Sequence, residues 1–318
     1  MGSVISGPDY SRITEKGLLG IFLREHEQLL DAGWADMVGF RSVSNQETET
    51  YVDLGMTPAM REWIGSRKAQ GLRVEEFSLT NKLYEDTLAV AVDDLRLDKL
   101  GVLERRIGNF AQRAAEHWEK LLTTLITSNG TCYDSQNYFS TSHSSGSSGT
   151  QDNALVAGTL SALNVTTAAS PTREEMIDII LGMIQEMYGF KDDVGEPLNG
   201  GARQFIVMVP TNMMASALGA INDNFTVSGG SNTLRENLLV SVRPVVNPRL
   251  TTATELYLFR ADANAKPFVL QSQQDVTTSI IGAGSEEEFK NRRWLFGLEA
   301  KRNVGYASWS SAVKGTTS

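Results

Sequence analysis

The sequence predicts an α+β protein organised around one long helix, and three observations support this. Between residues 100 and 125, apolar residues recur at steps of three and four, which places them on one face of an α-helix. Runs with strand composition lie on both sides of it, for example residues 87–92 and 204–209. After residue 170, helix and strand patterns alternate, which is typical of a compact α+β unit.

The central helix is expected to run from about residue 95 to residue 127. Asp93 or Asp94 can serve as its N-cap, and Asn129 followed by Gly130 is a typical stop. At ~1.5 Å per residue, such a helix spans on the order of 45–50 Å. This is longer than a compact domain of this size needs. We therefore expect a spine that lies across a flat molecule.

The chain before the central helix is expected to reach other molecules. Residues 1–35 hold a loose head and a helix from about residue 14 to residue 31. This helix has no core of its own and should pack on another part of the molecule or on a neighbour. Residues 36–83 indicate two strands around a polar excursion, which predicts a long two-stranded ribbon. An isolated ribbon is marginally stable in water, so we expect it to lie on a partner surface.

The excursion at the tip of this ribbon carries the side chains that we expect to contact a neighbour. Trp63 is an aromatic residue in a polar stretch, so a neighbouring subunit is expected to bury it. The basic residues of the excursion can touch nucleic acid or form ion pairs between subunits, and the acidic chain favours the ion pairs. Each exposed pair contributes roughly 0–1 kcal/mol. These basic residues are Arg61, Arg67, Lys68 and Arg73.

Composition excludes several classes of protein. The net charge of −9 argues against a protein that grips nucleic acid by neutralising phosphates, although an acidic wall can still surround it. The single cysteine, Cys132, excludes an internal disulfide and favours a reducing compartment. No apolar run reaches the ~18 residues that a membrane span needs, and no signal-peptide pattern opens the sequence. We expect no cofactor and no membrane association.

Cys132 and His143 can be interpreted as a nucleophile and its base, which would make the protein a soluble α+β hydrolase. A structural role is favoured for both residues. Cys132 follows the end of the central helix, His143 enters a Ser/Gly-rich loop, and no Asn or Asp is indicated to orient the histidine.

Two further groups have possible ligand-binding chemistry. Asp192, Asp193 and Glu196 can bind a hard cation, but their spacing fits no EF-hand, so a solvated acidic loop is favoured. The glycine-containing residues 228–232 can cradle a phosphate, but they lack the lysine of a P-loop and no strand leads into them. A mobile loop is favoured there.

A turn-rich stretch, YDSQNYFSTSH, follows the central helix at residues 133–143. It resembles the Tyr-Asp-Gly-Gln-x-Phe-Phe-Ser-Thr-x-His signature of the Mu-like major head subunit family, which belongs to the major capsid proteins of tailed bacteriophages. Here Ser135 replaces the glycine and Tyr138 replaces a phenylalanine. Other segments fit the same family in order: residues 84–90, 93–94, 114–117, 209–211 and 244–246.

This resemblance implies the HK97-like capsid fold, with five parts in chain order. They are an N-terminal arm at 1–35, an extended β-hairpin called the E-loop at 36–83, a peripheral domain with the spine helix and a loop insertion at 84–169, an axial α+β domain at 170–261, and C-terminal strands of the peripheral domain at 262–318. The resemblance also implies that residues 133–143 form a structural turn. In that turn the aromatic side chains of Tyr133, Tyr138 and Phe139 pack, and Asp134 caps the turn.

The resemblance implies a structural protein and not an enzyme. It implies a major capsid subunit that assembles into hexamers and pentamers of an icosahedral shell around phage double-stranded DNA, without sequence-specific binding. Barely 35 residues precede the E-loop, so we expect a separate scaffold or maturation protease, together with a portal protein. The expected location is the virion capsid, after assembly in the host cytoplasm. The alternatives are the hydrolase that uses Cys132 and His143, or another phage structural component such as a tail or decoration protein.

Overall fold

The computed structural model describes residues 7–30, 33–53, 75–97, 101–223, 231–232, 234, 239–263 and 265–318. Its helices are α1 (Gly7–Leu30), α2 (Ala35–Val38), α3 (Val92–Leu97), α4 (Val102–Ala115), α5 (His117–Ser128), α6 (Arg173–Gly189), α7 (Met214–Asn222) and α9 (Glu286–Asn291). Its strands are β1 (Gly39–Val43), β2 (Thr48–Asp53), β3 (Glu75–Thr80), β4 (Lys82–Ala91), β5 (Ala154–Val156), β6 (Gln204–Val209), β7 (Ser241–Val246), β8 (Glu255–Arg260), β9 (Phe268–Ile281), β10 (Arg293–Tyr306) and β11 (Ala312–Thr316).

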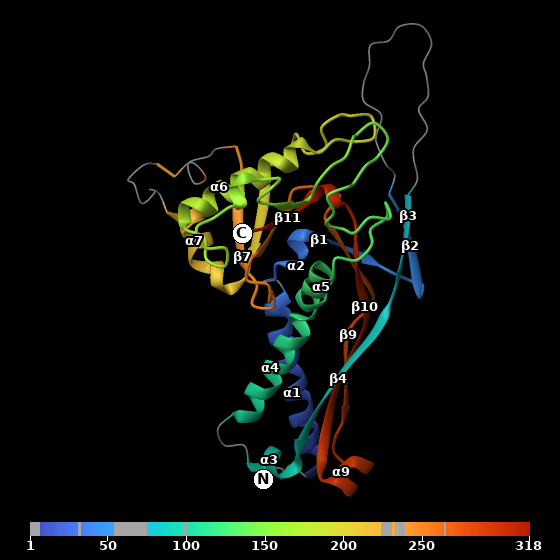
Figure 1. The fold of residues 1–318 in the computed structure, drawn as a ribbon. Helices are drawn as coiled ribbons and strands as arrows, with labels where there is room; N and C mark the ends of the chain where they lie inside the picture. The colour runs from blue at the N-terminus through green and yellow to red at the C-terminus, as the bar shows by residue number, and fades with distance from the viewer. Residues whose placement is uncertain are drawn as a thin grey trace.

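A four-stranded sheet forms the elongated part of the molecule, and its strand order is β1-β9-β10-β4. The long strands β9 and β10 each span 14 residues and pair antiparallel. β4 pairs antiparallel with the other edge of β10, and β1 pairs parallel with β9. Figure 1 shows the long strands running down the molecule, with α1 and α4 on the side opposite α9.

α1 and α4 pack together on this sheet through a small apolar core. Leu18 and Phe22 of α1 meet Ile107 and Phe110 of α4, and the rings of Phe22 and Phe110 lie 6.3 Å apart. The sheet contributes Val90, Trp294 and Phe296. Full burial of an apolar side chain of this size contributes roughly 1.5–3 kcal/mol. The N-terminal helix predicted from the sequence is therefore present, and it packs on the chain's own sheet.

A five-stranded sheet of order β5-β11-β8-β6-β7 carries α6 and α7. β6 is buried from Phe205 to Val209, because it lies between β7 and β8 with helices on its face. Four methionines, Met183, Met187, Met208 and Met213, are fully buried in the core of this half. Met214, the first residue of α7, is 47% exposed and lies outside this core.

The end of the chain joins this second sheet. β11 pairs antiparallel with β8 and parallel with β5, whereas β9 and β10 lie in the long sheet. Strands after residue 262 are therefore divided between the two sheets. The domain boundaries at 169/170 and 261/262 stay a prediction.

The prediction of one continuous helix from residue 95 to residue 127 is wrong. α4 begins after Gly101, which adopts the left-handed region (φ 64°) and so separates α4 from α3. α4 ends at Ala115, and α5 begins at His117. Glu116 between them has ψ near −2°, away from the helical value of about −42°. Periodicity identified the buried face of α4, where Leu103, Ile107 and Phe110 are buried. In α5 the buried face is shifted by one residue, because Leu122 and Ile126 are fully buried whereas Leu121 and Leu125 are only partly buried. Periodicity does not register such a local break in backbone conformation.

α6 begins with a capping box. Thr172 is the N-cap, because its hydroxyl accepts a hydrogen bond from the Glu175 N–H and the Glu175 carboxylate accepts one from the Thr172 N–H. The hydroxyl and N–H of Thr166 donate to the same carboxylate, and together these hydrogen bonds lower the pKa of Glu175 to about 2. Among the helices of the described ranges, none combines the length and apolar character that a membrane crossing requires.

Candidate functional site

The turn-rich segment after α5 is held together by a buried histidine. His143 is fully buried, its Nδ1 lies 2.5 Å from Asp134 Oδ2, and its Nε2 lies 3.2 Å from the Tyr138 carbonyl oxygen. Its ring stacks on Trp309 with centroids 4.1 Å apart. Burial alone would raise the pKa of Asp134, but the hydrogen bonds from His143 and from the Gln136 N–H lower it.

This geometry does not form a nucleophile and base. The expectation that no carboxylate orients His143 is wrong, because Asp134 does so. However, the second ring nitrogen faces the Tyr138 carbonyl oxygen and not the Cys132 thiol. Cys132 is buried, with Sγ 3.8 Å from the Ala307 carbonyl oxygen. A general base must lie within about 2.6–3.2 Å of the group it deprotonates, so the hydrolase alternative is not supported.

The segment instead ties α5 to the ends of the long strands. The buried Tyr138 hydroxyl donates towards the carbonyl oxygens of Pro267 and Ser308, at 2.9 and 3.1 Å. Its ring stacks on Tyr306 at 4.6 Å and meets Phe139 edge-on at 5.0 Å. Tyr138 and Phe139 pack as expected, and the Asp134 carboxylate caps the Gln136 N–H at 3.1 Å.

The sequence predicted a solvated acidic loop at residues 192–196. This is wrong for Asp192, which lies inside a closed turn. Asp192 is buried, and its Oδ1 accepts hydrogen bonds from the N–H groups of Val194 and Glu196, at 2.8 and 2.9 Å. Within the described ranges, no group of three or more His, Cys, Asp or Glu side chains is placed to hold a metal ion.

Only the end of the glycine-containing loop can be described. Residues 224–230 lie outside the described ranges. The buried Asn232 side chain donates to the carbonyl oxygens of Ala220 and Asp223, both at 2.8 Å, so it closes the end of α7.

The base of the predicted ribbon is present, and its tip lies outside the described residues. β2 and β3 pair antiparallel from Thr48–Thr80 to Asp53–Glu75. The rings of Tyr51 and Phe77 stack across the two strands at 5.1 Å, and the Tyr51 hydroxyl donates to Gln271 Oε1 of β9 at 2.9 Å. These contacts fasten the ribbon to the long sheet. The expected contact residues Arg61, Trp63, Arg67, Lys68 and Arg73 all fall in the undescribed range 54–74.

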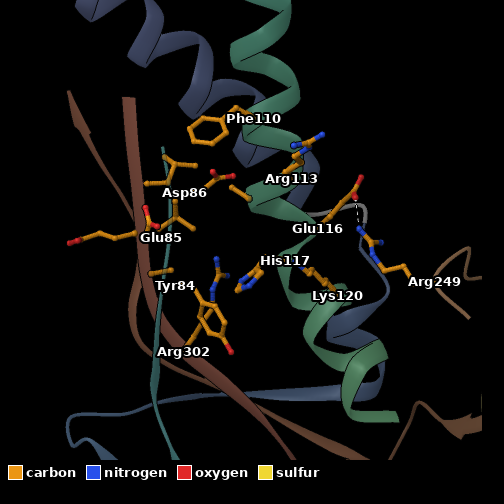
Figure 2. A pocket seen from close by; sticks show the side chains of 15 residues that line it. Tyr84, Glu85, Asp86, Phe110, Arg113, Glu116, His117, Lys120, Arg249 and Arg302 are labelled. Carbon is orange, nitrogen blue, oxygen red and sulfur yellow. Dashed lines mark hydrogen bonds and ion pairs between the residues drawn. The ribbon is translucent and has the colours of Figure 1, made fainter. Parts of the chain in front are cut away.

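A pocket of about 500 Å³ lies where α4 and α5 meet the long strands β4 and β10 (Figure 2). Its rim holds an ion pair between Glu116 at the helix break and Arg249, at 2.9 Å. His117, the first residue of α5, meets the Tyr84 ring of β4 edge-on at 4.6 Å. Eight charged side chains line the pocket: the acids Glu85, Asp86, Glu116 and Glu299, and the bases Arg113, Lys120, Arg249 and Arg302.

Arg302 of β10 is the deepest charge of this pocket. Its guanidinium lies 4.7 Å from the centroid of the Trp118 ring of α5, and the residue is only 4% exposed. Burial lowers the pKa of Arg302 to about 10, an effect that nearby Asp275 offsets only in part. Burial and the charge of Arg302 lower the pKa of His117 to about 4. The sequence did not single out Arg302, because only the packing of α5 on β10 buries it.

Comparison with known proteins identifies the family. Residues 25–173 and 241–317 match the family described as Mu-like prophage major head subunit gpT. The chain belongs to this family. Over 102 residues it is 32% identical to the major capsid protein of Escherichia phage Mu, an alignment that covers 31% of this chain and 33% of the relative. The chain therefore spans about a third of the length of the curated relatives it matches.

Solved structures share the fold of this gpT-family chain. The procapsid of bacteriophage JBD30 matches with a TM-score of 0.52 and 19% identity, over 95% of this chain and 75% of that one. The mature capsid of bacteriophage PhiM1 matches with a TM-score of 0.56 and 9% identity, over 89% of this chain and 86% of that one. Together with the two sheets, the spine and the ribbon base, these matches confirm the predicted α+β, HK97-like capsid fold.

Proposed function

We propose that this gpT-family chain is a structural major capsid subunit that assembles into the hexamers and pentamers of an icosahedral shell around double-stranded DNA. One observation carries the proposal. The head-subunit family match includes both the ribbon-and-spine segment, residues 25–173, and the long strand β10 with the chain end, residues 241–317. These two segments together form the elongated sheet of a fold that phage capsid chains share.

In this proposal, stability of the shell comes from repetition. Each subunit extends its ribbon to a neighbour. In a closed symmetric shell every subunit makes all of its weak contacts at the same time, so their contributions to stability add. The proposed contact residues are Trp63, Arg61, Arg67, Lys68 and Arg73. The stacked Tyr51 and Phe77, fastened to Gln271, support this role because they hold the ribbon base at a defined place on the sheet.

The proposed relation to DNA is enclosure without sequence recognition. A chain with net charge −9 repels a polyanion more than it attracts one, so it can wall in DNA without adhering to it. A separate scaffold or maturation protease and a portal protein are the further proposed partners. Assembly in the host cytoplasm is proposed as the step before the subunit is found in the virion.

The proposal is tested by negative-stain electron microscopy of the expressed full chain, with static light scattering for particle mass. We expect closed shells, or five- and six-membered rings that can build them. A tube would favour a tail component. A monomer or dimer that persists across salt, protein concentration and co-expressed scaffold candidates would contradict a shell-forming subunit.

A further inference from the structure

The pocket in Figure 2 contains a buried positive charge that no carboxylate of the described residues contacts directly. Arg302 Nε has no hydrogen-bond partner there, and the described residues supply neither a hydrogen bond nor an ion pair to the guanidinium. The adjacent Arg41 also approaches the Trp118 ring, at 5.7 Å, but Asp36 pairs with it through two hydrogen bonds of 2.6 and 2.8 Å. Among the described residues, the guanidinium groups of Arg41 and Arg302 lie beside Trp118, and Arg41 has a carboxylate within hydrogen-bond distance whereas Arg302 has none.

Such an arrangement is costly unless an anion completes it. A buried charge is ordinarily paired or hydrogen-bonded, because only such interactions offset the free-energy cost of removing the charge from water. Figure 2 shows the Arg302 guanidinium directed towards the cavity, between Tyr84 and His117. A planar guanidinium can pair with a carboxylate through two parallel hydrogen bonds. A carboxylate that enters the pocket from its open side could therefore pair with Arg302 in this way.

We propose that the pocket formed by Arg302, His117, Tyr84 and the rim pair Glu116–Arg249 binds a carboxylate side chain presented by a second copy of this chain. The inference rests on the proposed function, since it requires that copies meet. It adds a specific intersubunit site on the body of the subunit, separate from the expected contacts at the ribbon tip.

The charge of the pocket lining and the acidic composition of the chain favour a protein carboxylate as the occupant. Four acidic and four basic side chains line the pocket. A lining without net charge offers no net attraction to a nucleic-acid backbone, with its closely spaced phosphates, but it admits one carboxylate on a neutral or mixed surface. The chain itself carries 38 acidic against 29 basic residues, so each copy brings an excess of suitable groups.

The test compares the concentration at which half of the full-length subunits assemble, measured by light scattering, in three proteins. Arg302→Met removes the charge and keeps an unbranched stem against Trp118. Lys301→Met makes the same charge change at the neighbouring position of β10, which does not line the pocket. We expect Arg302→Met to raise the half-assembly concentration at least tenfold and Lys301→Met to change it less than threefold. Equal effects of both variants, or unchanged assembly of Arg302→Met, would overturn the inference.

A second measurement does not depend on Arg302→Met folding. In Arg302→Lys, a carbodiimide couples the introduced amine to a carboxylate in direct contact. With mixed ¹⁴N- and ¹⁵N-labelled subunits, we expect cross-linked peptides that join the two labels at position 302. Cross-links confined to one label, for example to Asp275 of the same chain, would overturn the proposal.

Two further outcomes separate failure of the carboxylate occupant from failure of the proposed function. If a 30-base-pair DNA duplex binds the unmodified subunit and loses at least tenfold affinity with Arg302→Met, a phosphate occupies the pocket and the carboxylate is wrong. If the unmodified chain forms no assembly under any condition, the proposed function fails first, and the second-copy occupant fails with it.

Discussion

The Asp134 carboxylate lies 2.5 Å from Nδ1 of His143, inside the turn-rich segment that joins α5 to the five-stranded sheet. The side chain of His143 is fully buried, and that of Asp134 is 10% exposed. Removing Asp134 leaves the buried Nδ1 of His143 without its hydrogen-bond partner, which costs roughly 1–3 kcal/mol.

We therefore expect Asp134→Ala to lower the free energy of unfolding of the unassembled subunit by roughly that amount, measured by urea denaturation. Asp178→Ala is the control, because Asp178 lies on the exposed face of α6. It should change the free energy of unfolding by about 0.5 kcal/mol or less. Similar losses in the two variants would show that the His143 pair has no special role.

Ser135 is the second testable position in this segment. It adopts φ 64°, in the left-handed region that favours glycine, and the Mu-like signature has glycine at the matching place. We expect Ser135→Gly to stabilise the subunit by about 0.5–1 kcal/mol, because relief of backbone strain exceeds the added entropy of the unfolded chain. Thermal unfolding followed by circular dichroism measures the change.

The matched control for this change is Ser144→Gly, at the residue that directly follows the segment. Ser144 is exposed and is not among the described residues with positive φ, so the substitution should destabilise the subunit slightly. A melting temperature that falls in both variants would contradict strain at Ser135.

Glu175 predicts a pH dependence at the start of α6. Its pKa is lowered from 4.5 to about 2, so its carboxylate contributes stability that is present above pH 4.5 and lost as pH falls towards 2. Glu175→Gln keeps the shape of the cap but removes the charge. We expect it to cost about 1 kcal/mol at pH 7, a typical capping contribution.

The decisive readout is the difference in unfolding free energy between the unmodified chain and Glu175→Gln, measured at pH 7, 4 and 2.5. The difference should shrink steadily towards low pH. A constant difference would mean that the charge of Glu175 does not account for the effect.

The ribbon tip provides the prediction that bears directly on assembly. We expect deletion of residues 57–73, or Trp63→Ala, to leave a folded subunit that cannot close shells, because the proposed intersubunit contacts lie at the tip and the buried cores of the described residues are built from other parts of the chain. Circular dichroism checks folding, and electron microscopy checks shells. Normal particles formed by the deletion variant would contradict a contact role for the tip.

Local sequence pattern determined the elements of this protein and much of its turn chemistry. The apolar steps of three and four placed Ile107 and Phe110 on the buried face of the spine, and the run at 204–209 became the buried strand β6. Periodicity succeeds for these residues because it reports the side-chain directions within one element. The stretch at 133–143 was recognisable for a related reason, since its turns are closed by side chains only a few residues apart.

The tertiary structure alone decided which residues lose contact with water when distant elements meet. Arg302 reads in the sequence as an ordinary charged strand residue, and it becomes a buried cation only because Trp118 of α5 covers it. The pairing of β11 with β8 and the ion pair of Arg249 with Glu116 at the pocket likewise join residues that are far apart in the chain. Desolvation and long-range pairing are properties of the assembled elements, so no local pattern contains them.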